Sequence, residues 1–311
     1  MALELSKDGS SAISLDRQRN LAIHFSDEPY ISIDTNPTIT CAIMTSPSSN
    51  VPLHITTIGD PSLPKIVFLH GFLGSGSDWL SFAHKLADRY CCVLVDLPGH
   101  GEAGIPEDGD ADGFFMRTVE AVAVEIRLLS AEPCVLVGYS MGGRIGLAMA
   151  LRYPELFSKA VIVSSSPGLR TAEERAARRK SDEGVARKIE RNFEGFIEFW
   201  YDQPLFSTLK SHALFREVEA QRKQGAPEQL ARALRLLGTG NQPSFWDELP
   251  GNHLPILFCV GEKDVKYVEI GHRMANICPE SQVEFFEACG HTLHIEEPER
   301  FLGSVERFIA Q

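Results

Sequence analysis

The stretch Val135-Leu136-Val137-Gly138-Tyr139-Ser140-Met141-Gly142-Gly143-Arg144 joins a short apolar run to a segment of helical character. It contains Gly-x-Ser-x-Gly, the pattern of a nucleophile elbow, in which a strained strand-to-helix turn exposes the serine Oγ. Gly138 and Gly142 suit this turn because a Cβ would clash where strand and helix cross. A glycine-rich turn could carry the pattern by chance. The apolar run before it and the amphipathic residues 145–153 after it favour an elbow with Ser140 at its tip.

Length and composition limit the classes of protein to which the chain can belong. Its 311 residues are 43% hydrophobic and 23% charged, as in an ordinary globular protein with one large α/β domain. The formal net charge of −12 predicts a surface that repels nucleic acid and anionic membranes. No apolar run approaches the ~18 residues that span a bilayer. We therefore expect neither a nucleic-acid partner nor a membrane span, and composition leaves the oligomeric state open.

The seven cysteines and the first residues bear on the cellular compartment. The cysteines are scattered, form no Cys-x-x-Cys pair, and in several cases lie in apolar runs. We expect buried thiols in a reducing compartment, with no disulfide and no metal site. Residues 1–37 resemble a flexible extension, and their acidic side chains disfavour an organelle transit peptide. This predicts a cytoplasmic protein, with a plastid as the alternative if the source is a photosynthetic eukaryote.

Short apolar runs alternate with helical segments along most of the chain. In residues 112–130, Val119, Val122 and Ile126 recur at helical spacing. Two strands around a turn are expected between 38 and 58. Continuous apolar runs, typical of strands buried on both faces, lie at 65–69, 92–95, 134–137, 160–163, 256–260 and 282–286. This alternation predicts an α/β fold with a mostly parallel, doubly wound sheet.

The alternation is interrupted between 167 and 248. Residues 170–194 are rich in both signs of charge, and Thr171-Ala172-Glu173-Glu174 is a capping-box pattern that begins a helix. We interpret 167–248 as a helical lid over the carboxyl ends of the strands, where ligands bind in such sheets. Residues 38–166 and 249–311 would then form the core. The alternative is a solvated helical face without a role.

Ser140 needs a base, because a serine hydroxyl is inert at neutral pH. In folds that use this elbow, the partners follow the serine in the order acid, then histidine. His291 comes after an apolar run and before a C-terminal helix, and fits that order. His294, three residues later, is the rival. His70 precedes the serine and is expected to shape a loop near the site.

The acid and the oxyanion hole are expected on two other loops. Gly261-Glu262-Lys263-Asp264 follows the apolar run 256–260. We prefer Asp264 to Glu262, because the shorter acid stands after the turn, where it can reach the histidine and orient it. The oxyanion hole would use the backbone N–H groups of Met141 and Phe72. The glycines at 71–76 do not match a nucleotide-binding pattern, so no nucleotide cofactor is expected.

Arg144 stands four residues after Ser140, on the helix that begins at the elbow. A simple ester hydrolase needs no cation at that place. A guanidinium there suggests that the substrate carries a carboxylate. The alternative is a salt bridge from Arg144 to the lid.

Six motifs together resemble one known family. In the core they are His70-Gly-Phe-Leu-Gly-Ser-Gly-Ser-Asp-Trp79, Asp96-Leu-Pro-Gly-His-Gly101 and residues 138–144, and in the lid residues 167–178, 199–206 and 237–244. The chain resembles the 2-succinyl-6-hydroxy-2,4-cyclohexadiene-1-carboxylate synthases of menaquinone and phylloquinone synthesis, which have the α/β-hydrolase fold. The resemblance covers roughly residues 53 to 310, and its lid motifs are more specific than the elbow.

The resemblance implies a cofactor-independent carbon–oxygen lyase. Such an enzyme eliminates pyruvate from 2-succinyl-5-enolpyruvyl-6-hydroxy-3-cyclohexene-1-carboxylate. Ser140, His291 and Asp264 would form a triad in which the serine removes a carbon-bound proton, and Phe72 and Met141 would supply the oxyanion hole.

The resemblance also implies residues that bind the substrate. The substrate is a small tricarboxylate anion. The family's contact residues match Tyr139, Arg144, Arg178 and Trp200, and more weakly Arg222, whose spacing from Trp200 no motif fixes. Trp200 could equally be part of the lid core. Two other functions remain open: a serine carboxylesterase or carbon–carbon bond hydrolase for a carboxylate-bearing substrate, and a non-catalytic receptor.

Overall fold

The computed structural model describes residues 44–45, 51–107 and 111–311. The expected extension 1–37 and most of the first expected strand lie outside these residues. At the centre is an eight-stranded sheet with the order β1-β2-β4-β3-β5-β6-β7-β8. Its strands are β1 (Met44–Thr45), β2 (His54–Ile58), β3 (Lys65–Leu69), β4 (Cys91–Asp96), β5 (Cys134–Tyr139), β6 (Phe157–Val163), β7 (Ile256–Gly261) and β8 (Ser281–Phe286).

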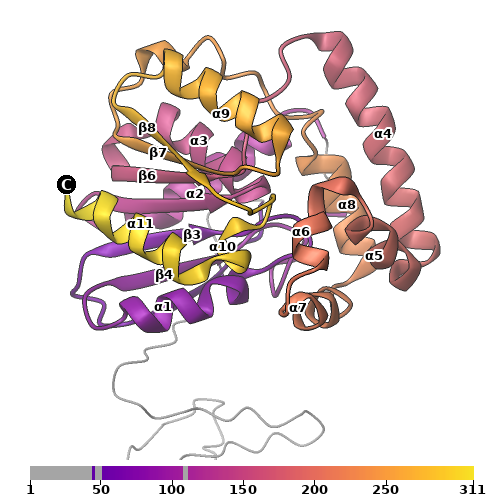
Figure 1. Ribbon diagram of the computed structural model, residues 1–311, viewed down its shortest axis with the longest axis horizontal. Helices are drawn as coiled ribbons and strands as arrows, with labels where there is room; N and C mark the ends of the chain where they lie inside the picture. The colour runs from indigo at the N-terminus through magenta and orange to yellow at the C-terminus, as the bar shows by residue number, and fades with distance from the viewer. Residues whose placement is uncertain (1–43, 46–50, 108–110) are drawn as a thin grey trace, which may run out of the picture.

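The sheet is mostly parallel, as the apolar runs predict. Strand β2 pairs antiparallel with β1 and with β4, and the other neighbours are parallel (Figure 1). Strands β4, β5 and β7 are buried along their whole length. Continuous burial explains why these strands lack alternation in sequence, since both faces of a parallel sheet are covered by helices.

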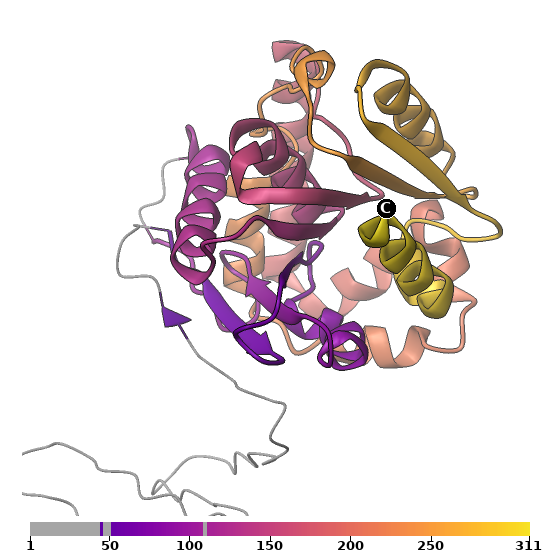
Figure 2. The ribbon, with the colours of Figure 1, turned by 90° about the vertical axis from the view of Figure 1, so that its left-hand side faces the viewer.

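Helices cover both faces of the sheet (Figure 2). The helices of the core are α1 (Leu80–Leu86), α2 (Phe114–Leu129), α3 (Met141–Arg152), α9 (Val265–Ile277), α10 (Leu293–Glu296) and α11 (Pro298–Ala310). Val67 and Leu69 of β3 pack with α2, α3 and α9, whereas Ile66 and Phe68 pack with α1 and α11 on the other face. Successive strand residues point to opposite faces, so one strand serves two cores. The doubly wound fold is confirmed.

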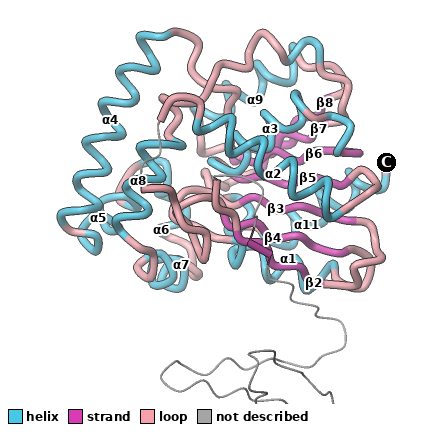
Figure 3. Tube along the Cα trace, turned by 180° about the vertical axis from the view of Figure 1, so that it is seen from behind, coloured by secondary structure: helices cyan, strands magenta, loops and turns pink. Residues whose placement is uncertain are grey.

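A group of helices stands between β6 and β7 in the sequence. They are α4 (Ala172–Arg191), α5 (Phe193–Tyr201), α6 (Ser207–Lys210), α7 (Phe215–Arg222) and α8 (Pro227–Leu237). They share a hydrophobic cluster of their own, to which Leu73 of the core contributes. Figure 3 shows helices and loops in this part and the strands confined to the sheet. The expected capping box begins α4: Glu174 N–H donates to Thr171 Oγ1, and Thr171 N–H donates to Glu174 Oε2.

Short 3₁₀ helices join several elements: η1 (Gly76–Trp79), η2 (Pro154–Leu156), η3 (Pro204–Phe206) and η4 (Leu249–Gly251). Within the described ranges, no helix is both long and apolar enough to cross a bilayer. The six cysteines in those ranges are buried and unbridged.

Candidate active site

The turn between β5 and α3 has the geometry expected of a nucleophile elbow. Ser140 has φ 48° and ψ −104°, a conformation that costs strain in a residue other than glycine. Its N–H donates to Val163 O at 2.9 Å. A Cβ on Gly142 would lie 2.4 Å from Leu69 O, so only glycine fits there. The sequence pattern therefore reflects a close crossing of backbones.

Three of the predicted residues form a hydrogen-bonded chain. Ser140 Oγ lies 3.0 Å from His291 Nε2, and His291 Nδ1 lies 2.6 Å from Asp264 Oδ2. An ionised Asp264 can only accept, so Nδ1 carries the proton and Nε2 is left to accept from the serine hydroxyl. Asp264 and His291 are both buried. This arrangement can draw the proton from Ser140.

The two rivals for these roles lie elsewhere. The ring of His294 packs between Trp79 and Tyr139, with centroids 5.0 and 4.3 Å away. Burial lowers the pKa of His294 to about 3, so the ring is neutral at pH 7. Glu262 is exposed to solvent. Neither side chain forms a hydrogen bond with Ser140 or His291 in the described part of the chain.

The oxyanion hole expected from the sequence would lie beside Ser140, between the N–H groups of Phe72 and Met141. The Gly71 carbonyl accepts from His70 Nδ1 at 2.8 Å and from Gly74 N–H at 3.0 Å. Because the peptide is trans and planar, the N–H of Phe72 points away from those donors. The N–H of Met141 opens the first turn of α3, where backbone donors have no partner within the helix. Phe72 and Met141 both line the cavity described next, and within the described ranges their N–H groups have no acceptor.

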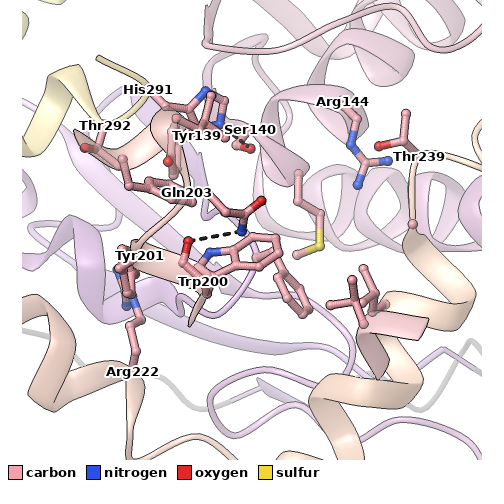
Figure 4. A pocket seen from close by; sticks show the side chains of 18 of the residues that line it. Tyr139, Ser140, Arg144, Trp200, Tyr201, Gln203, Arg222, Thr239, His291 and Thr292 are labelled. Atoms are coloured by element: carbon pink, nitrogen blue, oxygen red, sulfur yellow. Dashed lines mark hydrogen bonds between the residues drawn. The ribbon is translucent and has the colours of Figure 1, made fainter. Parts of the chain in front are cut away.

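A cavity of about 440 Å³ separates Ser140 from the helices of the insertion. Its volume is in the range of small-molecule sites, roughly 300–1,000 Å³. Figure 4 shows Arg144 and Arg222 on opposite sides of the cavity, with Trp200 and Gln203 between them. All the predicted contact residues line it: Tyr139, Arg144, Arg178, Trp200 and Arg222. No cluster of His, Cys, Asp or Glu in the described ranges could hold a metal ion.

Trp200 serves the lid core and the cavity together. Its ring packs against Phe72 and Phe206, with centroids 5.5 and 5.8 Å away. Its carbonyl accepts from Gln203 Nε2 at 3.0 Å. Trp200 therefore both lines the cavity and packs in the lid core, the two positions that were considered from the sequence. Tyr139 fills the space beside Gly71, where a Cβ would lie 2.5 Å from the tyrosine ring.

Arg144 is a buried cation without a carboxylate partner in the described part of the chain. Its guanidinium donates to Leu237 O at 2.8 Å and to Gln242 Oε1 at 3.2 Å. Burial, and then repulsion by Arg178, lower its pKa to about 10. The alternative expected from the sequence, a salt bridge to the lid, is not formed in the described part of the chain: Arg144 bonds to the lid, but both acceptors are neutral. A buried charge held only by neutral groups attracts an anion.

The other two predicted arginines are paired with acids. Arg178 Nε donates to Asp182 Oδ1 at 2.7 Å. Arg222 donates to both carboxylate oxygens of Asp78, at 2.6 and 2.9 Å. The charge of Arg222 is therefore matched inside the protein, which the sequence interpretation did not foresee.

Several cavity residues were not predicted from the sequence. They are Asp78, Tyr201, Gln203, Lys266 and Tyr267. Asp78 belongs to the motif 70–79, and Gln203 to the motif 199–206, so the signal was present in stretches already singled out. Lys266 and Tyr267 come two and three positions after Asp264, the acid of the triad. The first turn of a helix that begins at a catalytic loop commonly faces the same site.

Comparisons with known proteins agree with this geometry. The family model for the alpha/beta hydrolase fold matches residues 64–298. The putative 2-succinyl-6-hydroxy-2,4-cyclohexadiene-1-carboxylate synthase of Bacillus subtilis is 33% identical over 265 residues, which are 84% of this chain and 96% of that protein. The chain belongs to this synthase family. The resemblance drawn from the motifs is confirmed, and with it an enzyme of the α/β-hydrolase fold.

A solved structure and a plant protein are also similar to this member of the synthase family. The structure of MenH from S. aureus superposes with a TM-score of 0.78 and 30% identity, over 83% of this chain and 98% of that one. Protein PHYLLO, chloroplastic, of Arabidopsis thaliana is 36% identical over 260 residues. That match spans 79% of this chain but 15% of the plant protein. The compartment expected from the sequence, cytoplasm or plastid, stays a prediction.

Proposed function

We propose that this chain eliminates pyruvate from 2-succinyl-5-enolpyruvyl-6-hydroxy-3-cyclohexene-1-carboxylate and releases 2-succinyl-6-hydroxy-2,4-cyclohexadiene-1-carboxylate. One observation carries the proposal beyond membership of the family. The Ser140–His291 pair opens into a cavity lined, among the described residues, by four cationic side chains and two acidic ones outside the triad. The cations are Arg144, Arg178, Arg222 and Lys266, and the acids are Asp78 and Asp182. Such an excess suits a substrate with three carboxylates.

The first step of the proposed reaction is a proton transfer. His291 Nε2 takes the proton of Ser140, and the carboxylate of Asp264 stabilises the resulting imidazolium. Ser140 Oγ then removes the proton from the ring carbon that bears the succinyl group. That proton is acidified by the adjacent ketone. The distances of 3.0 and 2.6 Å along the chain of three residues support this relay.

The electron pair of the broken C–H bond forms the new double bond at ring position 2. The existing double bond moves from position 3 to position 4, and the C–O bond at position 5 breaks. The leaving enolpyruvate takes up one proton and becomes pyruvate, which balances the proton removed from the ring. Negative charge that develops on the succinyl carbonyl oxygen would be stabilised by the N–H groups of Phe72 and Met141.

We also infer that residues 167–248 act as a lid over this reaction. Trp200, Arg178 and Arg222 come from the insertion and line the cavity together with Ser140 of the core. A covered site excludes water, which strengthens the interactions with the substrate anions. In this mechanism Ser140 acts as a base and forms no acyl-enzyme.

A hydrolase would use the same three residues, so the test must compare reactions. The purified chain is given the enolpyruvyl substrate, with pyruvate followed by a coupled lactate dehydrogenase assay, and separately p-nitrophenyl esters. The proposal predicts a kcat/KM for pyruvate release at least about 1,000-fold above that for ester hydrolysis, a difference of about 4 kcal/mol. Ester hydrolysis faster than pyruvate release would favour the carboxylesterase or carbon–carbon bond hydrolase.

A further inference from the structure

We propose that Lys266 is a further substrate-binding cation, which together with Arg144 and Arg178 forms a dicarboxylate-binding end of the cavity. The inference rests on the proposed function for the identity of the natural substrate. Lys266 is the second residue of α9 and follows Asp264 of the triad by two positions. It lines the same cavity as Ser140, Arg144 and Arg178. The loop that presents the acid to His291 thus also presents a cation to the cavity.

Arg178 lies close enough to Arg144 and to Lys266 to affect both. Burial, and then repulsion by Arg178, lower the pKa of Lys266, although solvent reaches this side chain at the cavity rim. Arg178 has the same repulsive effect on Arg144. In the described ranges, Asp182 is the acid paired at this end, and it binds Arg178. Apart from Asp264, which is bound to His291, Asp182 is the one acid facing these three cations in the described ranges, so positive charge is in excess at this end.

Lys266 is also in an unfavourable place without an anion. The amino end of a helix carries partial positive charge, and a lysine there is repelled by it. The first turn of α9 itself contains no acidic residue. The N-cap residue Asp264 attracts Lys266, but its carboxylate already accepts a hydrogen bond from His291. Within the described ranges the ammonium of Lys266 forms no hydrogen bond or ion pair, and Nζ lies 5.4 Å from the centroid of the Tyr267 ring. An anion bound in the cavity would offset the repulsion by the helix end and would give the ammonium of Lys266 a partner.

The opposite end of the cavity is electrically balanced. Arg222 stands across Trp200 and Gln203 from Arg144 (Figure 4), and Asp78 binds its guanidinium through both oxygens. The charges without a hydrogen-bonded acidic partner in the described ranges are therefore those of Arg144 and Lys266, at the end where Arg178 is paired with Asp182. This asymmetry would orient a substrate with several carboxylates, drawing two of them to the end lined by Arg144, Arg178 and Lys266.

The test compares the Lys266→Gln variant with wild type and with Lys263→Gln. Lys263 is exposed, lies three residues earlier outside the cavity lining, and its loss changes the net charge equally. Lys266→Gln is expected to raise KM for the enolpyruvyl substrate about tenfold, with kcat within about twofold, because an ion pair formed in ground and transition states alike affects binding alone. Lys266→Arg should keep KM near the wild-type value.

A second arm needs no turnover. The probe for calorimetric titration is 2-oxoglutarate, a dicarboxylate that contains the –CO–CH2–CH2–COO⁻ unit of the succinyl arm. Its Kd is expected to be about tenfold higher for Lys266→Gln than for Lys263→Gln, whereas the monocarboxylate butyrate should show no such difference. If the wild type releases no pyruvate, the proposed function fails, while this titration still decides the role of Lys266. Equal KM and Kd values in Lys266→Gln and Lys263→Gln would overturn the inference, and so would a wild type that does not bind 2-oxoglutarate.

Discussion

The guanidinium of Arg222 donates hydrogen bonds to both carboxylate oxygens of Asp78, at 2.6 and 2.9 Å, and both side chains are buried. Arg222 ends α7 of the insertion, and Asp78 belongs to η1 of the core. Beside them, Gln221 Nε2 donates to Ser77 Oγ at 2.8 Å. The pair therefore links the insertion to the core by a matched charge at the edge of the cavity.

Asp78→Asn should be strongly destabilising, because it leaves the charge of Arg222 buried without a counter-charge. Breaking a buried ion pair costs about 3–5 kcal/mol. Urea denaturation should show this loss, and the double variant Asp78→Asn/Arg222→Gln should recover part of it. The control is Asp202→Asn, which removes an exposed ion pair with Lys210 and should cost less than about 1 kcal/mol. Equal losses of stability in Asp78→Asn and Asp202→Asn would show that the buried pair contributes little.

Arg144→Gln should impair the reaction of the tricarboxylate more than that of a neutral ester. Arg144 has only neutral acceptors in the described ranges, Leu237 O and Gln242 Oε1, so its charge is available to a substrate carboxylate. We expect kcat/KM for pyruvate release to fall about 100-fold, or about 3 kcal/mol, and that for a p-nitrophenyl ester to fall less than about fivefold. The matched control is Arg152→Gln, on the exposed part of the same helix. Equal losses on both substrates would assign Arg144 a structural role.

His294 should make the folded protein less stable as the pH falls below neutrality. Its pKa in the native protein is lowered to about 3 by burial, below the ordinary value of 6.5. Between pH 7 and pH 5 the unfolded chain therefore gains a proton that the native chain does not. This lowers the free energy of unfolding by about 2 kcal/mol. His294→Gln lacks this contribution. Between pH 7 and pH 5 its free energy of unfolding should therefore fall by about 2 kcal/mol less than that of wild type. Identical pH dependences in urea denaturation would rule out a buried neutral His294.

Local sequence patterns predicted much of the fold for a physical reason. Strands buried on both faces need continuous apolar runs, and the helical spacing of Val119, Val122 and Ile126 marks the buried face of α2. Gly138 is required by the backbone of Gly142, only four residues along the same turn. The order of Ser140, Asp264 and His291 along the chain then allowed the triad to be predicted.

The remaining features depend on contacts between distant segments. Asp78 and Arg222 are 144 residues apart, and no motif fixes the spacing that brings them together. The acceptors of Arg144 belong to the last residue of α8 and to the loop after it, 93 and 98 residues away. Whether a cation is matched or unmatched is decided by such pairings, so sequence alone could assign three arginines to the substrate but could not rank them. For the same reason the exposed but unpaired Lys266 was not recognised.

The most direct test of the account is pyruvate release by wild type and by Ser140→Ala, measured with the purified chain and the enolpyruvyl substrate. The account predicts one pyruvate for each diene product with wild type, and a kcat lower by at least about 1,000-fold with Ser140→Ala at an unchanged midpoint of unfolding. Pyruvate release by Ser140→Ala with the kcat of wild type, or no pyruvate release by wild type, would contradict the proposed role of Ser140.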